Sequence, residues 1–205
     1  ANRITTVIQL GDAPFGGAPF RIAIRPNGLA YVTAARAVVV LDTATNEVIT
    51  TIPVARYVHD IAIDPDDSFA YVTIDDSPGS VMVIDMASNT VIGAIQVGGR
   101  PQGIAITPNG QTAYVANLLS NSVSLIDTAT LAVVDTIVVG DLPSGVAITP
   151  AGDSAYVTNS GLFGYVSVIN TQTRSVTETI ALYPSSTNPV SVAIANVPRR
   201  TPSTP

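Results

Sequence analysis

One stretch of the chain, GIAITPNGQTAYVANLLSNSVSLID at residues 103–127, recurs in close variants along almost the whole sequence. Each copy opens with an Ile/Val-Ala-Ile triplet and continues, after a turn, into an Ala-Tyr-Val triplet. The copies begin at Ile22, Ile61, Ile104 and Val146, and a fifth opening triplet begins at Val192. A period of about 40 residues is typical of four-stranded propeller blades and is too long for leucine-rich repeats. The chain is therefore a repeat array, and the repeat constrains the fold more than any other feature.

Each repeat reads as four short strands, a to d, separated by turns. In the third repeat, strand a covers 103–107, a Pro-Asn-Gly turn follows, and strand b covers 113–116. Strands c and d follow at 122–126 and 132–139. A sheet of this kind has two faces to bury, and radial stacking of sheets around an axis buries both. We therefore expect an all-β protein, a β-propeller of four-stranded antiparallel blades, with four complete repeats at 22–54, 61–97, 104–139 and 146–182.

Two residue types recur at fixed places in the repeat. A tyrosine follows the first alanine of every strand b, and we expect its ring to pack between neighbouring blades. An Asp or Asn closes every strand c, where its side chain can accept hydrogen bonds from backbone N–H groups two residues on, which is a structural role. The tyrosines are Tyr31, Tyr71, Tyr114 and Tyr156, and the turn residues are Asp42, Asp85, Asp127 and Asn170.

The two ends of the array do not complete a blade. Residues 2–10 match a strand d and residues 191–196 match a strand a, so partial blade strands are expected at both termini of a propeller domain spanning 1–197. Residues 198–205 have the composition of a Pro/Thr linker or tail. Three explanations stay open: the chain is part of a longer ring, two chains associate to complete the ring, or the last blade is irregular.

Composition argues against several classes of function. The net charge is −6 and every basic residue is an arginine, so we expect no nucleic-acid partner. No apolar run approaches the roughly 18 residues of a membrane helix, so we expect no membrane insertion. The chain has no cysteine, which excludes disulfides and thiolate metal sites. We find no cofactor motif and expect no cofactor.

The amino-acid sequence of the repeats resembles that of a known family. Residues 104–110, 126–130 and 156–159 together resemble the YVTN-type β-propeller repeat of archaeal and bacterial surface proteins, and the resemblance extends over residues 2–196. It implies a ring of seven blades, an extracellular or cell-surface location, and a role in binding, adhesion or surface-layer formation. It implies no catalytic residues, because the family has no shared catalytic set.

Antiparallel strand order places the d-to-a connections and the b-to-c loops on one side, which we call the variable face because these loops differ in length and charge. Function in repeat folds tends to lie where repeats differ. One reading makes this face a polar pocket in which His59 is a base and the arginines hold a carboxylate or phosphate. The other reading is a solvated loop histidine beside ordinary surface charges. We favour the second, because the single histidine has no Glu nearby. The candidate ligand-binding residues are Arg21, Arg36, Arg56, His59, Asp60, Asp75, Asp76 and Arg100.

The acidic residues of the second repeat suggest a calcium site when they are read along the chain. Asp64, Asp66 and Asp67 belong to an a-to-b turn, whereas Asp75 and Asp76 belong to a b-to-c loop on the opposite face. Calcium needs six or more oxygens at one point. We therefore expect no metal site, and we assign no catalytic residue.

The sequence thus predicts a non-enzymatic extracellular or cell-surface β-propeller that binds a protein or glycan partner through its variable face, or acts as a scaffold. The alternative is a propeller-type lactonase or lyase with a site at the channel mouth near His59. Such enzymes gather several His, Glu, Asp or Asn ligands around a metal, whereas this chain has one histidine.

Overall fold

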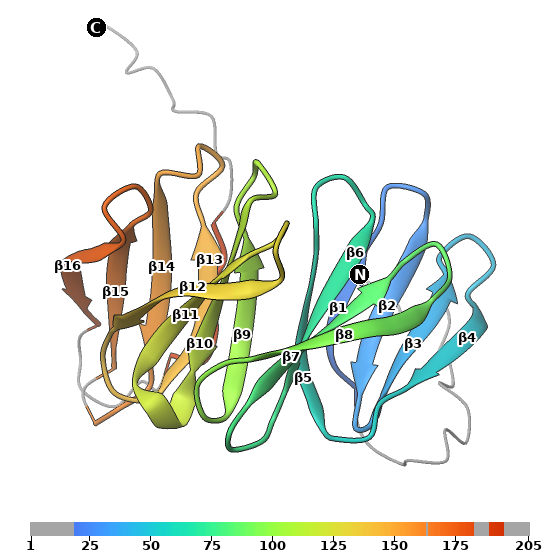
Figure 1. The fold of residues 1–205 in the computed structure, drawn as a ribbon, viewed down its shortest axis with the longest axis horizontal. Coiled ribbons are helices and arrows are strands. Elements are labelled where there is room, and N and C mark those ends of the chain that lie inside the picture. The colour runs from blue at the N-terminus through green and yellow to red at the C-terminus, as the bar shows by residue number, and fades with distance from the viewer. Residues whose placement is uncertain (1–18, 163, 183–188, 195–205) are drawn as a thin grey trace, which may run out of the picture.

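The computed structural model describes residues 19–162, 164–182 and 189–194, which form four antiparallel sheets of four strands each (Figure 1). Blade 1 consists of β1 (Pro19–Ile24), β2 (Leu29–Ala34), β3 (Ala37–Asp42) and β4 (Glu47–Pro53). Blade 2 consists of β5 (Val58–Ile63), β6 (Phe69–Ile74), β7 (Ser80–Asp85) and β8 (Thr90–Gln96). Blade 3 consists of β9 (Pro101–Ile106), β10 (Thr112–Asn117), the 3₁₀ turn η1 (Leu118–Ser120), β11 (Ser122–Asp127) and β12 (Ala132–Val138). Blade 4 consists of β13 (Pro143–Ile148), β14 (Ser154–Asn159), β15 (Tyr165–Asn170) and β16 (Ser175–Ala181).

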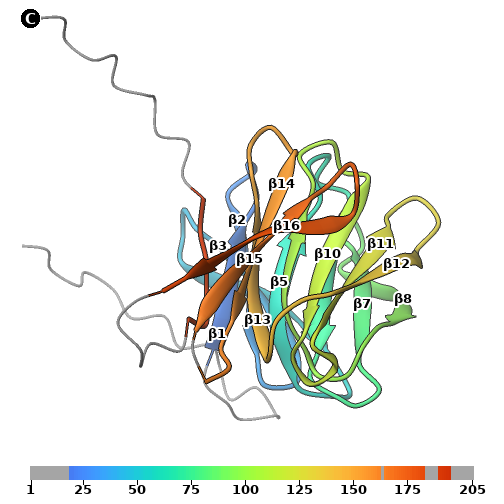
Figure 2. The same cartoon turned by 90° about the vertical axis from the view of Figure 1, so that its left-hand side faces the viewer.

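The predicted β-propeller architecture is confirmed. Strands that follow one another in the chain are neighbours in each sheet, so every blade is a simple meander. The blades succeed each other in chain order across the molecule, and their first strands contact one another in the series β1, β5, β9, β13 (Figure 1). Each sheet twists strongly, so that β16 crosses β13 obliquely (Figure 2). No helix among the described residues is long and apolar enough to cross a membrane.

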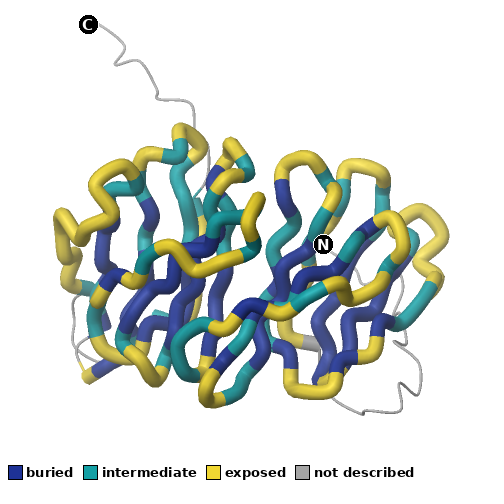
Figure 3. The backbone as a smooth tube through the Cα atoms, viewed as in Figure 1, coloured by how far each residue is buried: buried dark blue, intermediate teal, exposed yellow. Residues whose placement is uncertain are grey.

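Three of the four hydrophobic clusters lie between two consecutive blades, and the fourth, formed by Ala30, Val32, Ala34, Val39 and Leu41, lies within blade 1. Each of the three inter-blade clusters combines the strand-b tyrosine and strand-c residues of one blade with apolar residues from the first three strands of the next. Buried residues accordingly follow the strands, while most exposed residues lie at the loops and turns (Figure 3). The clusters include Tyr31, Val38 and Val40 with Ile61, Val72 and Ile84; Tyr71, Val81 and Val83 with Ile104, Val115 and Ile126; and Tyr114, Val123 and Leu125 with Val146, Val157 and Ile169.

Within the described residues, the array of blades has two open ends. Tyr31, Tyr71 and Tyr114 are buried as predicted, but Tyr156 is only partly buried because blade 4 is the last complete blade. At the other end, Ile22 of β1 is 58% exposed, whereas Ile104 at the same register position of blade 3 is 5% exposed. In the internal blades, the residues at these positions pack against the preceding blade. In β1 they remain exposed, because no described blade packs against this side of blade 1.

The predicted fifth strand a lies only partly within the described residues. Residues 189–194 form no strand, yet they run beside β13: a Cβ on Gly145 would meet Ser191 Cα at 2.9 Å. The same construction on Gly103 would meet Gly145 Cα of the next blade at 3.0 Å. Residues 189–194 therefore occupy the place of a fifth innermost strand, although they pair with no strand among the described residues. The expected strand d at 2–10, residues 195–197 and the tail at 198–205 lie outside the described residues.

Each innermost strand begins three residues before the opening triplet of its repeat, for example at Val58, whereas the triplet begins at Ile61. The register between strands a and b shifts at this point in all four blades. A β-bulge of this kind interrupts the alternation of side chains between the two faces of the sheet. Strands are recognised in a sequence by that alternation. Arg21, His59 and Asp60 consequently lie within strands β1 and β5 and not in the loops before them.

Both predicted turn chemistries are present. In the a-to-b turns, Gly28, Gly110 and Gly152 have positive φ angles, as the Asn-Gly and Ala-Gly pairs require. In the c-to-d turns, Thr130 N–H donates to Asp127 Oδ1 at 2.7 Å and Thr173 N–H donates to Asn170 Oδ1 at 2.8 Å. These side chains serve the turns, as predicted from their spacing.

Candidate functional site

The structure places all eight candidate residues at the variable face. Arg21 lies in β1, and His59 and Asp60 lie in β5, all near the strand ends that meet this face. The others occupy b-to-c loops or d-to-a connections: Arg36, Arg56, Asp75, Asp76 and Arg100.

The arginines at the blade 2 loops are neutralised by neighbouring carboxylates. Arg56 Nη1 lies 2.9 Å from Asp76 Oδ2, and Arg100 Nε lies 3.0 Å from Asp75 Oδ1. The Arg100 backbone N–H also donates to the Asp76 carbonyl oxygen at 2.7 Å, which ties the two loops together. Cations that already have carboxylate partners are poorly placed to hold an anionic ligand, so the geometry argues against a phosphate or carboxylate pocket here.

Arg36 has a different partner. Its guanidinium carbon lies 5.2 Å from the centre of the Tyr57 ring, a cation–π arrangement on the surface. The Tyr57 side chain remains 55% exposed. The pair therefore presents an aromatic ring with a fixed orientation to solvent.

His59 is not the solvated loop residue that we favoured from the sequence. Its ring stacks on Phe20 with centroids 5.8 Å apart, and its Nδ1 is buried without a hydrogen-bond partner among the described residues. Burial lowers the pKa of His59, and the charge of Arg21 lowers it further. The imidazole is thus held in its neutral form, but no carboxylate in the described part of the chain hydrogen-bonds to it and orients it, as the Asp of a Ser-His-Asp triad does.

Asp60 joins the innermost strands of blades 2 and 3. Its Oδ1 accepts a hydrogen bond from Ile61 N–H at 2.9 Å, and its Oδ2 accepts one from Ile104 N–H at 3.1 Å. Burial raises the pKa of Asp60, and these two hydrogen bonds and Arg21 act in the opposite direction. Arg21 Nε is 4.0 Å from Asp60 Oδ1. The carboxylate is occupied by backbone donors, so its role is to connect two blades.

The acidic residues of blade 2 also have separate partners. Asp64 Oδ1 accepts from the backbone N–H groups of Ser68 and Phe69 within its own turn. Asp67 Oδ1 lies 2.8 Å from Arg25 Nε of the preceding blade. Among the described residues, no group of three His, Cys, Asp or Glu side chains is arranged to hold a metal ion.

The sequence reading missed the apolar side chains of the variable face. Tyr57, Leu119, Leu142 and Leu162 lie in its loops and connections with 55%, 57%, 39% and 92% of their surface exposed. No large exposed hydrophobic residue lies in the described turns of the opposite face. These residues are leucines and a tyrosine within otherwise polar loops, which is a signal present in the sequence. The candidate residues of these loops were instead chosen by their charge.

Fold and site together define a β-propeller whose variable face combines neutralised ion pairs with exposed apolar side chains. No family model matches the chain, and no curated protein matches it. Among solved structures, it is similar to Kuenenia stuttgartiensis hydrazine synthase, with 29% sequence identity and a TM-score of 0.78. The similarity covers 91% of this chain and 54% of that chain, so the present chain spans about half the length of the hydrazine synthase chain.

Proposed function

We propose that the protein is a non-enzymatic β-propeller that acts as a binding module or structural scaffold and engages a protein partner through its variable face. The observation that carries this proposal is the confinement of exposed loop-borne apolar side chains to one face. Apolar and aromatic anchors inside a polar rim are the usual anatomy of a protein interface. Here Tyr57, Leu119, Leu142 and Leu162 supply the anchors and the ion pairs of Arg56 and Arg100 supply the rim.

The test is selection of ligands by the intact chain and by a variant with Tyr57→Ser, Leu119→Ser and Leu162→Ser. A phage-displayed peptide library is selected on the intact chain, and selected peptides are titrated against both proteins. We expect apolar or aromatic peptides that lose at least tenfold in affinity on the variant. The matched control replaces Val48 and Ile49 of β4, which are exposed on the outer strand of blade 1, by serine. Equal loss in the control, or no loss in the variant, would contradict a site on the variable face.

The extracellular or cell-surface location is part of the same proposal. It is supported by the resemblance to YVTN-type surface repeats and by a chain that needs no reducing environment, because it has no cysteine. Fractionation of the source cells with an antibody against the chain tests this location. Recovery in the cytosol alone would contradict it.

The alternative function is a propeller-type lactonase or lyase with a site near His59. The buried, unpartnered Nδ1 of a neutral imidazole is the one observation that favours it. The test is hydrolysis of a lactone panel by the wild-type chain and by His59→Ala. Activity that disappears in His59→Ala would support the enzyme reading, and absence of lactone turnover in the wild type would remove it.

Self-association that completes the ring is a further part of the proposal. Ile22 and Ile24 of β1 are 58% and 65% exposed at positions that internal blades pack against a preceding blade. We expect two chains to associate end to end over this surface. Light scattering coupled to gel filtration should therefore give a dimer mass that falls to the monomer mass in Ile22→Asp. A wild-type monomer at high concentration would refute this association.

A further inference from the structure

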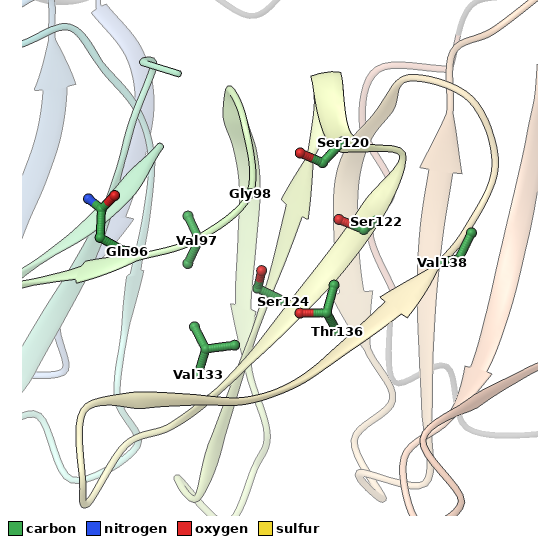
Figure 4. A pocket seen from close by; sticks show the side chains of 9 residues that line it. All are labelled: Gln96, Val97, Gly98, Ser120, Ser122, Ser124, Val133, Thr136 and Val138. Atoms are coloured by element: carbon green, nitrogen blue, oxygen red, sulfur yellow. The ribbon is translucent and has the colours of Figure 1, made fainter. Parts of the chain in front are cut away.

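A groove of about 480 Å³ opens between blades 2 and 3, and none of the eight candidate residues lines it. Its blade 3 side carries Ser122, Ser124 and Thr136, and Val97 faces them from the end of blade 2 (Figure 4). Val133 and Val138 of β12 form an apolar wall of the groove. None of the residues that line the groove is charged. The volume lies within the range of small-molecule sites.

The groove is hollow because of side-chain size at two register positions. In the next inter-blade space, Tyr165 stands where blade 3 has Ser122, since both pair with the last residue of strand b. Its ring lies over Gly140, and the corresponding groove has only about 230 Å³. In blade 2, Met82 stands where blade 3 has Ser124, and it packs against the hydrophobic core. Blade 3 alone has a small hydroxyl residue at both positions.

A buried amide holds these hydroxyl groups. Asn117 is fully buried, and its Nδ2 donates to Ser122 Oγ at 3.2 Å and to Ser124 Oγ at 2.9 Å. In this orientation the Oδ1 atoms of Asn117 and of Asn159, the equivalent residue of blade 4, are buried without a hydrogen-bond partner among the described residues, while Asn159 Nδ2 reaches the carbonyl oxygens of Val157 and Tyr165.

With the amide in this orientation, each serine oxygen accepts a hydrogen bond and keeps its own proton for another acceptor. Ser122 and Ser124 are only 5% and 2% exposed, yet both line the groove, and among the described residues neither hydroxyl donates to a protein acceptor. Ser120 Oγ likewise accepts from Gly99 N–H at 2.7 Å. The groove thus presents fixed O–H donors on a neutral floor between apolar walls, and buried donors of this kind favour a ligand that supplies acceptors.

We propose that this groove binds a neutral saccharide ring. The ether and hydroxyl oxygens of a sugar accept hydrogen bonds from the serines and Thr136, and its C–H surface contacts Val97 and Val133. The lack of charge on the groove gives no favourable partner to an acidic sugar. The groove shares no lining residue with the anchors of the proposed protein-binding surface, although Ser120 follows Leu119 in the same loop, so the test uses variants of groove residues alone.

The chain offers its own control, because Ser122→Tyr introduces the residue that blade 4 already carries at this position. Glucose, galactose, N-acetylglucosamine and maltose are titrated into the labelled protein, and backbone amide shifts are followed by NMR. At least one sugar should produce saturable shifts around Ser122 and Ser124 in the wild type, and Ser122→Tyr should weaken it at least tenfold. Tyr165→Ser opens the second groove and should add shifts at residues 138–140.

Thermal denaturation of each variant checks that it remains folded. If Ser122→Tyr does not fold, Ser124→Met fills the same groove with the residue that blade 2 carries there. The proposal is overturned if none of the four sugars gives a saturable shift in the wild type, or if binding persists unchanged in a folded variant whose groove is filled.

Discussion

Replacing Tyr114 by alanine tests the central packing claim, that the strand-b tyrosines hold neighbouring blades together. The ring belongs to the cluster between blades 3 and 4, where it packs among Val146, Val157 and Ile169 and is 1% exposed. Burial raises the pKa of the Tyr114 hydroxyl, as expected for a phenol kept from water. The substitution removes the ring and leaves a cavity between two sheets.

The magnitude follows from the buried area. A buried aromatic side chain covers about 150–250 Å², and each Å² of apolar surface contributes about 25 cal/mol. After allowance for the methyl group that alanine keeps, the loss is about 4 kcal/mol, within the range measured for large-to-alanine changes in protein cores. Tyr156→Ala is the matched control, because Tyr156 has the same register position but is partly exposed at the end of the array. Its cost should be about half as large.

Urea denaturation followed by circular dichroism measures both free energies of unfolding. Repeat arrays can lose cooperativity when one interface is weakened, so the slope of each transition is compared with that of the wild type. A third variant, Tyr114→Phe, keeps the ring and should stay close to the wild type. A cost below about 1 kcal/mol for Tyr114→Ala would show that the ring is not a core element. Equal costs for Tyr114→Ala and Tyr156→Ala would refute the idea that blade 4 is the end of the packed array.

Three further predictions concern the site and the turns. The folded-state pKa of His59 is lowered, so the unfolded chain binds a proton first as pH falls below about 6.5. The free energy of unfolding should therefore fall below that pH, and it should fall less in His59→Asn. Identical pH profiles of the two proteins would contradict the burial of the ring. Arg174 has φ of +53° where blade 2 has Asn89, so Arg174→Asn should raise the free energy of unfolding by about 0.5–1 kcal/mol in chemical denaturation, and a destabilising effect would count against this strain. Asp127→Ala should lower the melting temperature through loss of the hydrogen bonds from Thr130, whereas Asp127→Asn should preserve it, and the reverse order would disprove the turn role.

The sequence predicted the blades well because their determinants are local and repeated. These determinants are the turn glycines, the Asp or Asn at the end of strand c and the alternation within strands, and each acts over a few residues. Because the pattern occurs in four copies, an irregular residue in one copy does not hide it. The tyrosines were predicted as inter-blade residues for the same reason, and only Tyr156 differs, since its exposure depends on a neighbour beyond blade 4 and not on its own repeat. The surface role, the resemblance to YVTN repeats and the identity of a partner stay predictions.

The site was harder to predict because its contacts join residues far apart in the chain. The stack of Phe20 on His59 and the hydrogen bond from Ile104 N–H to Asp60 cross blade boundaries. No local pattern encodes such contacts. The β-bulge that carries His59 into a strand also interrupts the alternation from which its environment would be read. Strand order therefore assigned the charged residues to the variable face, but the surroundings of His59 were predicted wrongly from the sequence.

At some register positions, one blade carries a residue that differs from its equivalents in other blades. These positions show where the regular packing between blades is interrupted. Asp60 replaces the glycine that blades 3 and 4 use, and it is compensated at once by two backbone donors. Ser122 lies where blade 4 has Tyr165, and Ser124 lies where blade 2 has Met82. The described chain does not fill the space beside these two serines, and neither hydroxyl donates to an acceptor in it. A stable repeat can fill this space, as Tyr165 does in blade 4. An unfilled, donor-lined gap in an otherwise close-packed array is therefore better explained by a ligand than by packing.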